Sequence, residues 1–203
     1  NLAFSRDSNF RYLHHGNQIA DPLTGGMTAK EIEDGSVIFE DDNLKISAFK
    51  VFHEPIEPAL GYKFEYKDRV LVISGDTRYD SELVKSFKGA DVLFCEVISP
   101  DIVYRFIKAA EKQNDMKLKK ILVDILDYHI SPLEAVDLAN EAGVRHLVYY
   151  HLTPTLPNEI RFLSDKFFFA GVDEAIENWT ASTDGTMVVL PSNSKEILIS
   201  EIN

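Results

Sequence analysis

The segment Ser74–Arg78 (SGDTR) is the most informative part of this 203-residue chain. It directly follows the apolar run Val70–Ile73 (VLVI), which is typical of a buried strand, and it precedes a helical pattern. Asp76 is therefore expected at the C-terminal mouth of a strand, where loops converge and ligands bind in layered α/β folds. An aspartate in this position also fits a turn cap, so a functional interpretation needs support from elsewhere in the chain.

Three histidines provide that support. His53 and His151 each end a segment with a strand pattern, and His129 lies between an apolar segment and a well-signalled helix. A single histidine in such a place is more often a hydrogen-bonded surface or core residue. Together with Asp76, however, the three form the set of imidazole and carboxylate groups that binds zinc, manganese or iron. The pattern therefore predicts a metal site at the ends of strands.

Several motifs, in the expected order, resemble the metallo-β-lactamase superfamily, and more narrowly its branch of ribonuclease Z and arylsulfatase-like hydrolases. In one of them Cys95 stands where that branch has a histidine. The matching segments are His53–Pro55, Pro58–Phe64, Ser74–Arg78, Leu93–Val97, Asp127–Pro132 and Tyr150–Pro154.

The resemblance implies a fold and a set of roles. The fold is a partial αββα metallo-β-lactamase-type sandwich, in the α/β (α+β) class. His53 would bind a first metal ion, Asp76 would bridge two ions, and His151 would bind the second. Glu96 and His129 would form a hydrogen-bonded pair that protonates the leaving group.

The function implied by the resemblance is that of a metal-dependent hydrolase. It would attack an ester (phosphate, sulfate or related) or an amide bond of a small-molecule substrate with a metal-bound hydroxide. The cofactors would be two divalent ions, zinc first, with manganese or iron as alternatives. A pair of cations lowers the pKa of a shared water, and an imidazole held by a carboxylate can donate a proton to the leaving oxygen. Arg78 and Tyr128, beside the proposed ligands, are candidates to contact an anionic group.

The chain departs from the family in one respect. It has no His-x-His-x-Asp-His segment upstream of His53, and that segment would supply further ligands to both ions. We therefore expect the chain to be the C-terminal portion of a longer protein, incomplete and inactive by itself. The two ions are expected in the longer protein and need not be bound by this portion alone. A half-sandwich also leaves an uncovered sheet face, so self-association into a homo-oligomer is expected.

Two alternatives to the general hydrolase remain open. The first is a ribonuclease Z-type endonuclease that processes the 3′ side of precursor tRNA. In that enzyme a long tRNA-gripping arm separates the strand holding Tyr62 from the loop holding Asp76, whereas a short hairpin joins them here. The second is a metal-free interaction module that has kept the fold and lost half of the site.

Composition sets further limits. A formal net charge of −12 makes nucleic acid an unlikely partner, because phosphate contacts require clustered lysine and arginine. No apolar run reaches the length of a membrane span. The single cysteine excludes an internal disulfide and gives no indication of the compartment.

Residues 1–203 are interpreted as one domain, with residues 1–40 as an irregular lead-in or insertion. The clearest helix is predicted over 132–142, because Ser131 and Glu134 form a capping box and Gly143 ends it. Leu133, Val136 and Ala139 are expected to face the core. The other predicted elements are strands 44–52, 91–97 and 197–202, helices 81–87 and 101–112, and two hairpins, 61–66 with 69–73 and 179–183 with 186–190.

Overall fold

A computed structural model describes residues 10–14, 30–155 and 165–202. The chain divides into two compact units, Asn1–Ile32 and Glu33–Asn203. The described part of the first unit contains a short helix over residues 10–14. The second unit holds the sheets and helices discussed below. Among the described residues, no helix has the length and apolar character needed to cross a bilayer.

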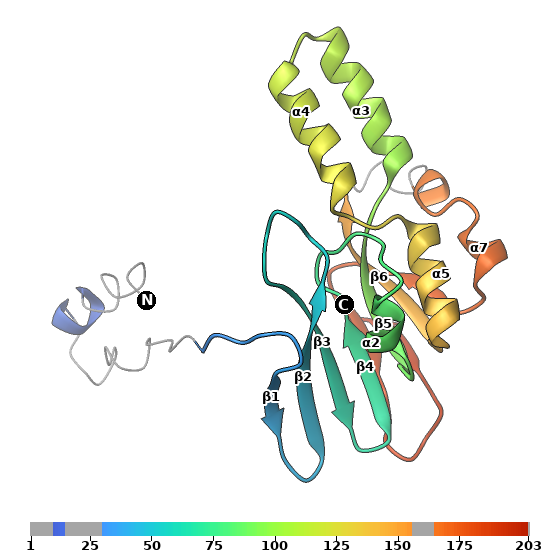
Figure 1. The fold of residues 1–203 in the computed structure, drawn as a ribbon. Coiled ribbons are helices and arrows are strands. Elements are labelled where there is room, and N and C mark those ends of the chain that lie inside the picture. The colour runs from blue at the N-terminus through green and yellow to red at the C-terminus, as the bar shows by residue number, and fades with distance from the viewer. Residues whose placement is uncertain (1–9, 15–29, 156–164, 203) are drawn as a thin grey trace. The chain divides into compact units, whose positions relative to one another are not determined.

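A seven-stranded mixed sheet forms the centre of the second unit, with the strand order β1-β2-β3-β4-β5-β6-β7 (Figure 1). Neighbours are antiparallel from β1 to β4 and parallel from β4 to β7. A separate two-stranded sheet pairs β8 with β9. The strands are β1 Val37–Glu40, β2 Leu44–Val51, β3 Ala59–Tyr66, β4 Arg69–Ile73, β5 Val92–Ile98, β6 His146–Thr153, β7 Trp179–Ala181, β8 Thr186–Val189 and β9 Leu198–Glu201.

The strand directions bring four chain segments to one edge of the sheet. Strands β4, β5 and β6 are parallel, so their carboxyl ends lie together. Strand β2 runs the same way, because β2 and β4 are both antiparallel to β3. The segments that follow β2 and β4 therefore meet the ends of β5 and β6, and this edge is where sheets of this kind bind ligands.

The helices connect these strands. Helix α5 starts at the predicted capping box: the Ser131 side chain accepts from the Glu134 N–H, and the Glu134 carboxylate accepts from the Ser131 N–H. Gly143 ends it in the left-handed conformation, so this helix is confirmed in detail. The helices with both ends described are α2 Leu83–Phe87, α3 Pro100–Lys112, α4 Met116–Asp124, η1 Ile125–Asp127, α5 Pro132–Ala142 and α7 Val172–Ala175, and residues 165–168 are also helical.

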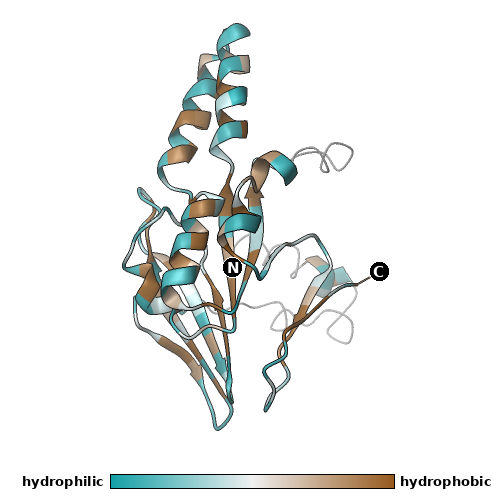
Figure 2. Ribbon diagram, turned by 90° about the vertical axis from the view of Figure 1, so that its right-hand side faces the viewer, coloured by the Kyte–Doolittle hydropathy of each residue, from teal (hydrophilic) through white to brown (hydrophobic). Residues whose placement is uncertain are grey.

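The main core lies between one face of the sheet and helices α2, α5 and α7. Phe87, Leu93 and Tyr149 are fully buried in it. Val136 and Ala139 are buried as expected, but Leu133 is 45% exposed, so its assignment to the core was wrong. The buried face of α5 includes Pro132 and Val136, and Leu133 lies beyond the edge of that face. Figure 2 shows the apolar residues concentrated along the central strands.

The opposite face of the sheet is apolar and only partly covered. Its residues on β3, β4, β5 and β6 are partly exposed: Tyr62, Phe64, Leu71, Ile73, Phe94 and Tyr150. Val188 and Leu190 border a cavity of about 360 Å³ on this face. The arrangement has the uncovered face expected of a partial sandwich, and self-association stays a prediction.

Two local expectations differ from the structure. The turn at Asp184–Gly185 was predicted to join 179–183 and 186–190 as a hairpin, but β7 pairs with β6 and β8 pairs with β9. A turn signal fixes the local reversal, whereas the partners of these short strands are chosen by longer-range packing. Strand β1 lies within the stretch 1–40 that was expected to be irregular, and it pairs with β2.

Helices α3 and α4 form a hairpin that projects from the edge of the sheet where the four segments meet (Figures 1 and 2). A second apolar cluster holds the two helices together, and Val103 and Leu122 are buried in it. The apolar segment 121–123, which precedes His129, is part of α4. The hairpin therefore carries the chain from β5 to the segment that contains His129.

Candidate metal and acid–base site

The loop after β4 is fixed by hydrogen bonds to both neighbouring segments. The Thr77 hydroxyl is fully buried and accepts from the Phe52 N–H at 3.1 Å. The Thr77 N–H donates to Glu96 Oε1 at 3.0 Å. The Ser74 hydroxyl accepts from the Glu96 N–H at 3.2 Å. This network joins the ends of β2, β4 and β5 and holds Asp76 between them.

Gly75 gives this loop its shape. Its φ is +66°, and a Cβ atom there would lie 2.6 Å from the carbonyl oxygen of Leu60. We predict that Gly75→Ala lowers the free energy of unfolding by at least about 2 kcal/mol, because left-handed backbone strain and a backbone clash add together. Gly89→Ala is the matched control, since Gly89 has a φ of +79° and open space around it. Equal losses in urea denaturation would show that the contact with Leu60 is unimportant.

Asp76 and His151 lie side by side. Asp76 Oδ1 is 3.4 Å from His151 Nδ1, and both side chains are partly exposed. Two donors that each lie about 2.1 Å from one tetrahedral zinc ion are separated by about 3.4 Å, so this spacing suits a shared ion. His151 occupies a β-bulge: Glu96 pairs with Tyr150 and Val97 pairs with Leu152, which leaves His151 unpaired at a φ of +45°. The bulge redirects this side chain at the edge of the sheet.

His53 reaches the same edge from β2. Its Nδ1 lies 2.9 Å from the carbonyl oxygen of Tyr128. A carbonyl can only accept, so Nδ1 carries the proton and Nε2 keeps a free lone pair, which is the tautomer of a metal ligand. The ring of His53 is 5.3 Å from the ring of His129, centre to centre. His53 therefore lies beside the cluster with a nitrogen available for a cation.

Glu96 and His129 are in direct contact. Glu96 Oε1 is 2.9 Å from His129 Nδ1, and the side chains are 0% and 7% exposed. The other carboxylate oxygen of Glu96 is buried without a hydrogen-bond partner among the described residues. Burial raises the pKa of Glu96, and the hydrogen bond and charge of His129 oppose that effect only in part. This buried contact fixes the ring orientation of His129.

The raised pKa of Glu96 gives a stability prediction. Between its ordinary pKa and the raised one, the folded protein holds a proton that the unfolded chain has released, so stability falls as pH rises through this window. In Glu96→Gln that fall is expected to disappear, with the hydrogen bonds to one oxygen retained. Urea denaturation from pH 4 to 8 measures it, with the exposed Glu111→Gln as control. An unchanged slope in Glu96→Gln would contradict the assignment.

The structure brings four of the five proposed residues into one connected cluster and places the fifth against it. Ligand atoms of Asp76, His129 and His151 all lie within 4.8 Å of one another. In the parts of the chain that the structure describes, this is the one group of three or more such side chains. One carboxylate with imidazoles is a donor set that suits zinc, and His53 extends the set on one side.

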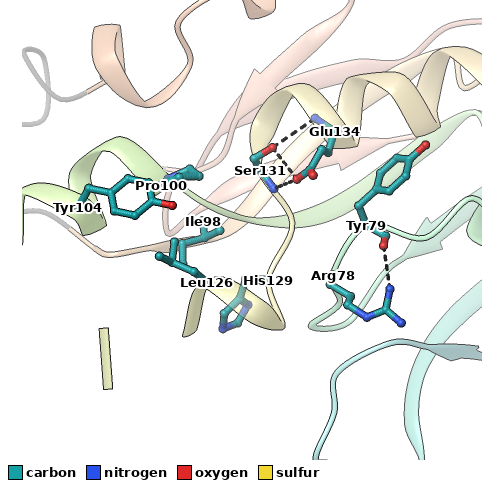
Figure 3. A pocket seen from close by; sticks show the side chains of 9 residues that line it. All are labelled: Arg78, Tyr79, Ile98, Pro100, Tyr104, Leu126, His129, Ser131 and Glu134. Carbon is teal, nitrogen blue, oxygen red and sulfur yellow. Dashed lines mark hydrogen bonds between the residues drawn. The ribbon is translucent and has the colours of Figure 1, made fainter. Parts of the chain in front are cut away.

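A pocket beside His129 was not foreseen from the sequence. It has a volume of about 380 Å³, and Figure 3 shows Tyr104 and Tyr79 on its two sides, with Arg78 near Tyr79. The Arg78 guanidinium also contacts Glu54 Oε2 at 3.4 Å. Tyr104 comes from α3, twenty-five residues before His129. No local pattern in the sequence links Tyr104 to the site, because it is the path of the α3–α4 hairpin that places it there.

Comparisons with known proteins agree with this architecture. A sequence model of the β-lactamase superfamily domain matches residues 6–152. The chain belongs to the metallo-β-lactamase superfamily. Zinc is a typical ion of this superfamily, and the aspartate and histidine cluster described above is compatible with it.

Curated relatives of this superfamily member include ribonucleases Z. The ribonuclease Z of Mycobacterium marinum is 32% identical over 154 residues, which cover 76% of this chain and 50% of the relative. That of Mycolicibacterium paratuberculosis is 33% identical over 154 residues, with the same two coverages. The chain thus spans about half the length of these relatives.

Among solved structures, a variant of the β-hydroxylase CmlA of Streptomyces venezuelae resembles this chain with a TM-score of 0.50. It is 10% identical, and the match covers 80% of this chain and 34% of that one. At this identity the likeness concerns the fold alone.

Proposed function

We propose that this chain contributes the acid–base and metal-binding half of a hydrolase that cleaves a phosphate ester. The observation that carries the proposal is the convergence of Asp76, His129 and His151, whose ligand atoms lie within 4.8 Å of one another. In this proposal Asp76, His151 and His53 bind the cations, and His129 stays free of them. A bound divalent ion would polarise the ester and lower the pKa of water.

The residues of the chain act on the leaving group. His129, held by Glu96, donates a proton to the leaving oxygen as negative charge develops on it. Burial of Glu96 keeps water from this contact, so the ring of His129 holds one orientation during the step. Arg78, on the wall of the adjoining pocket, supplies a cation near the phosphoryl group. The choice of a phosphate over a sulfate or an amide rests on the names of the relatives.

The proposal is tested with this chain joined to an upstream half that carries the family's His-x-His-x-Asp-His segment. The assay is hydrolysis of bis(p-nitrophenyl) phosphate, with p-nitrophenyl sulfate as the comparison. Zinc-dependent release of nitrophenol from the phosphodiester, and a loss of that release in Asp76→Ala, is the expected result. Faster turnover of the sulfate would overturn the choice of phosphate. The absence of turnover with zinc, manganese and iron alike would favour the metal-free interaction module.

A ribonuclease Z-type endonuclease is a second candidate, because two relatives that carry this name are 32% and 33% identical to the chain. Against it, the turn Lys67–Asp68 joins β3 directly to β4, so no arm is inserted between Tyr62 and Asp76. Cleavage of a precursor tRNA at the 3′ side of its acceptor stem would favour this candidate. Turnover of simple diesters without such cleavage would favour the general phosphoesterase.

A further inference from the structure

The α3–α4 hairpin is a basic region on an acidic protein. Residues 100–124 contain six lysine and arginine residues and four acids, a net charge of +2, whereas the whole chain has a net charge of −12. The hairpin projects from the sheet edge that carries the candidate site (Figure 1). The net charge that argued against a nucleic-acid partner therefore conceals a local positive region next to the site.

Three residues form a line along α3, which we call the α3 track: Tyr104, Lys108 and Lys112. Spacing by four places them on the same side of the helix, about one turn or 5.4 Å apart. Tyr104 is 54% exposed and lines the same pocket as His129. The track therefore starts at the site and extends outward along the helix for about 12 Å.

The two lysines of the track are available for a ligand. Both are exposed, and neither has an ion-pair partner in the parts of the chain that the structure describes. By contrast, Lys119 pairs with Glu111 at 2.7 Å and Lys120 pairs with Asp124 at 2.8 Å on the same hairpin. Acids thus neutralise part of the hairpin and leave the track charged.

We propose that the α3 track binds a single strand of RNA that leaves the site past His129. Lys108 and Lys112 would contact phosphates, which releases counterions, and Tyr104 would stack against a base. An acidic peptide would use the cations alone and leave the exposed ring without a partner. RNA is favoured over DNA by the ribonuclease names of the relatives. This inference rests on the proposed function in one respect, which is that the bound RNA strand extends from the site of hydrolysis outward along α3.

The direct test is binding of a fluorescein-labelled 12-nucleotide RNA, measured by fluorescence anisotropy in EDTA between 50 and 200 mM salt. The variant Lys108→Glu/Lys112→Glu is expected to bind at least tenfold more weakly. Loss of two phosphate contacts should also reduce the salt slope by about 1.4, at roughly 0.7 for each contact with a single strand. The control Lys85→Glu/Lys88→Glu makes the same charge change on α2 and at its C-cap, and it should bind within twofold of wild type.

A second variant tests the aromatic residue. Tyr104→Leu keeps an apolar side chain of similar size, so it should fold normally and bind RNA about tenfold more weakly with an unchanged salt slope. If the Lys108/Lys112 and Lys85/Lys88 double variants lose RNA affinity equally, the α3 track is not a specific binding surface. The loss would then reflect only the change in the net charge of the protein. Competition by polyglutamate as effective as by RNA would indicate an acidic-peptide surface and overturn the RNA assignment. So would tighter binding of DNA of the same sequence.

The outcomes separate this inference from the proposed function. Track-dependent RNA binding by a protein that hydrolyses no ester supports the track and rejects the hydrolase. Zinc-dependent hydrolysis with RNA binding unaffected by the track variants rejects the track and leaves the hydrolase in place.

Discussion

Replacing His129 with alanine is expected to slow the hydrolysis of phosphodiesters that have poor leaving groups by about 10²- to 10⁴-fold. Diesters with good leaving groups should lose less than about tenfold, because their oxygen departs without a proton. The structural reason is the contact between His129 and buried Glu96, which holds one imidazole with 7% exposure beside Asp76 and His151. The measurement is kcat for a series of aryl and alkyl diesters, plotted against the pKa of the leaving group.

His146→Ala is the matched control for this experiment. His146 is also a partly buried imidazole, and its Nε2 lies 2.9 Å from the Thr180 hydroxyl, at the start of β6 and far from the carboxyl end of that strand. His146→Ala should give the same plot of kcat against leaving-group pKa as wild type. Uniform slowing of all diesters by His129→Ala, together with a loss of bound zinc, would show instead that His129 is a metal ligand.

The pairing of Glu96 with His129 illustrates what sequence could and could not supply. The two residues are 33 positions apart, and the α3–α4 hairpin lies between them. Only the family resemblance put them together, because no periodicity relates a residue in β5 to one after η1. Once the parallel pairing of β4, β5 and β6 is known, the contact between Glu96 and His129 is understandable, because both residues lie at the same edge of the sheet.

Local chemistry made other elements predictable. The ends of α5 were confirmed because a capping box and a left-handed glycine act within a few residues of each other. The β3–β4 hairpin was confirmed for the same reason. By contrast, the pairing of β7 with β6 depends on contacts between Trp179 and the buried Tyr149, whose rings lie 5.6 Å apart, and no turn signal reports them.

The position of His151 was predictable from the sequence, but its conformation was not. The sequence predicts that His151 ends a strand, but β6 continues to Thr153, and His151 is the extra residue of a bulge. A bulge in one strand is set by its register against the neighbouring strand, here β5. The pattern of a single segment therefore located the histidine and could not give its left-handed backbone or its 3.4 Å approach to Asp76.

Removal of Asp76 is expected to have the largest effect on cation binding. In Asp76→Ala, zinc affinity should fall by at least 100-fold, because this carboxylate is the shared neighbour of His151 and of the proposed first ion. Thermal unfolding with and without zinc measures this effect. A ligand present at 100 times its Kd stabilises a protein by about 2.7 kcal/mol, so wild type should gain several degrees and Asp76→Ala none.

A control variant distinguishes zinc binding at the site from zinc binding by exposed carboxylates. Asp127→Ala removes an exposed carboxylate two residues from His129 and should retain the full zinc response. His151→Ala should lose as much of the response as Asp76→Ala, and His53→Ala should lose part of it. If instead neither wild type nor any of the three site variants responds to zinc, Asp76, His151 and His53 bind no ion. The fold would then serve as a metal-free interaction module, and the contact of Glu96 with His129 would have a structural role.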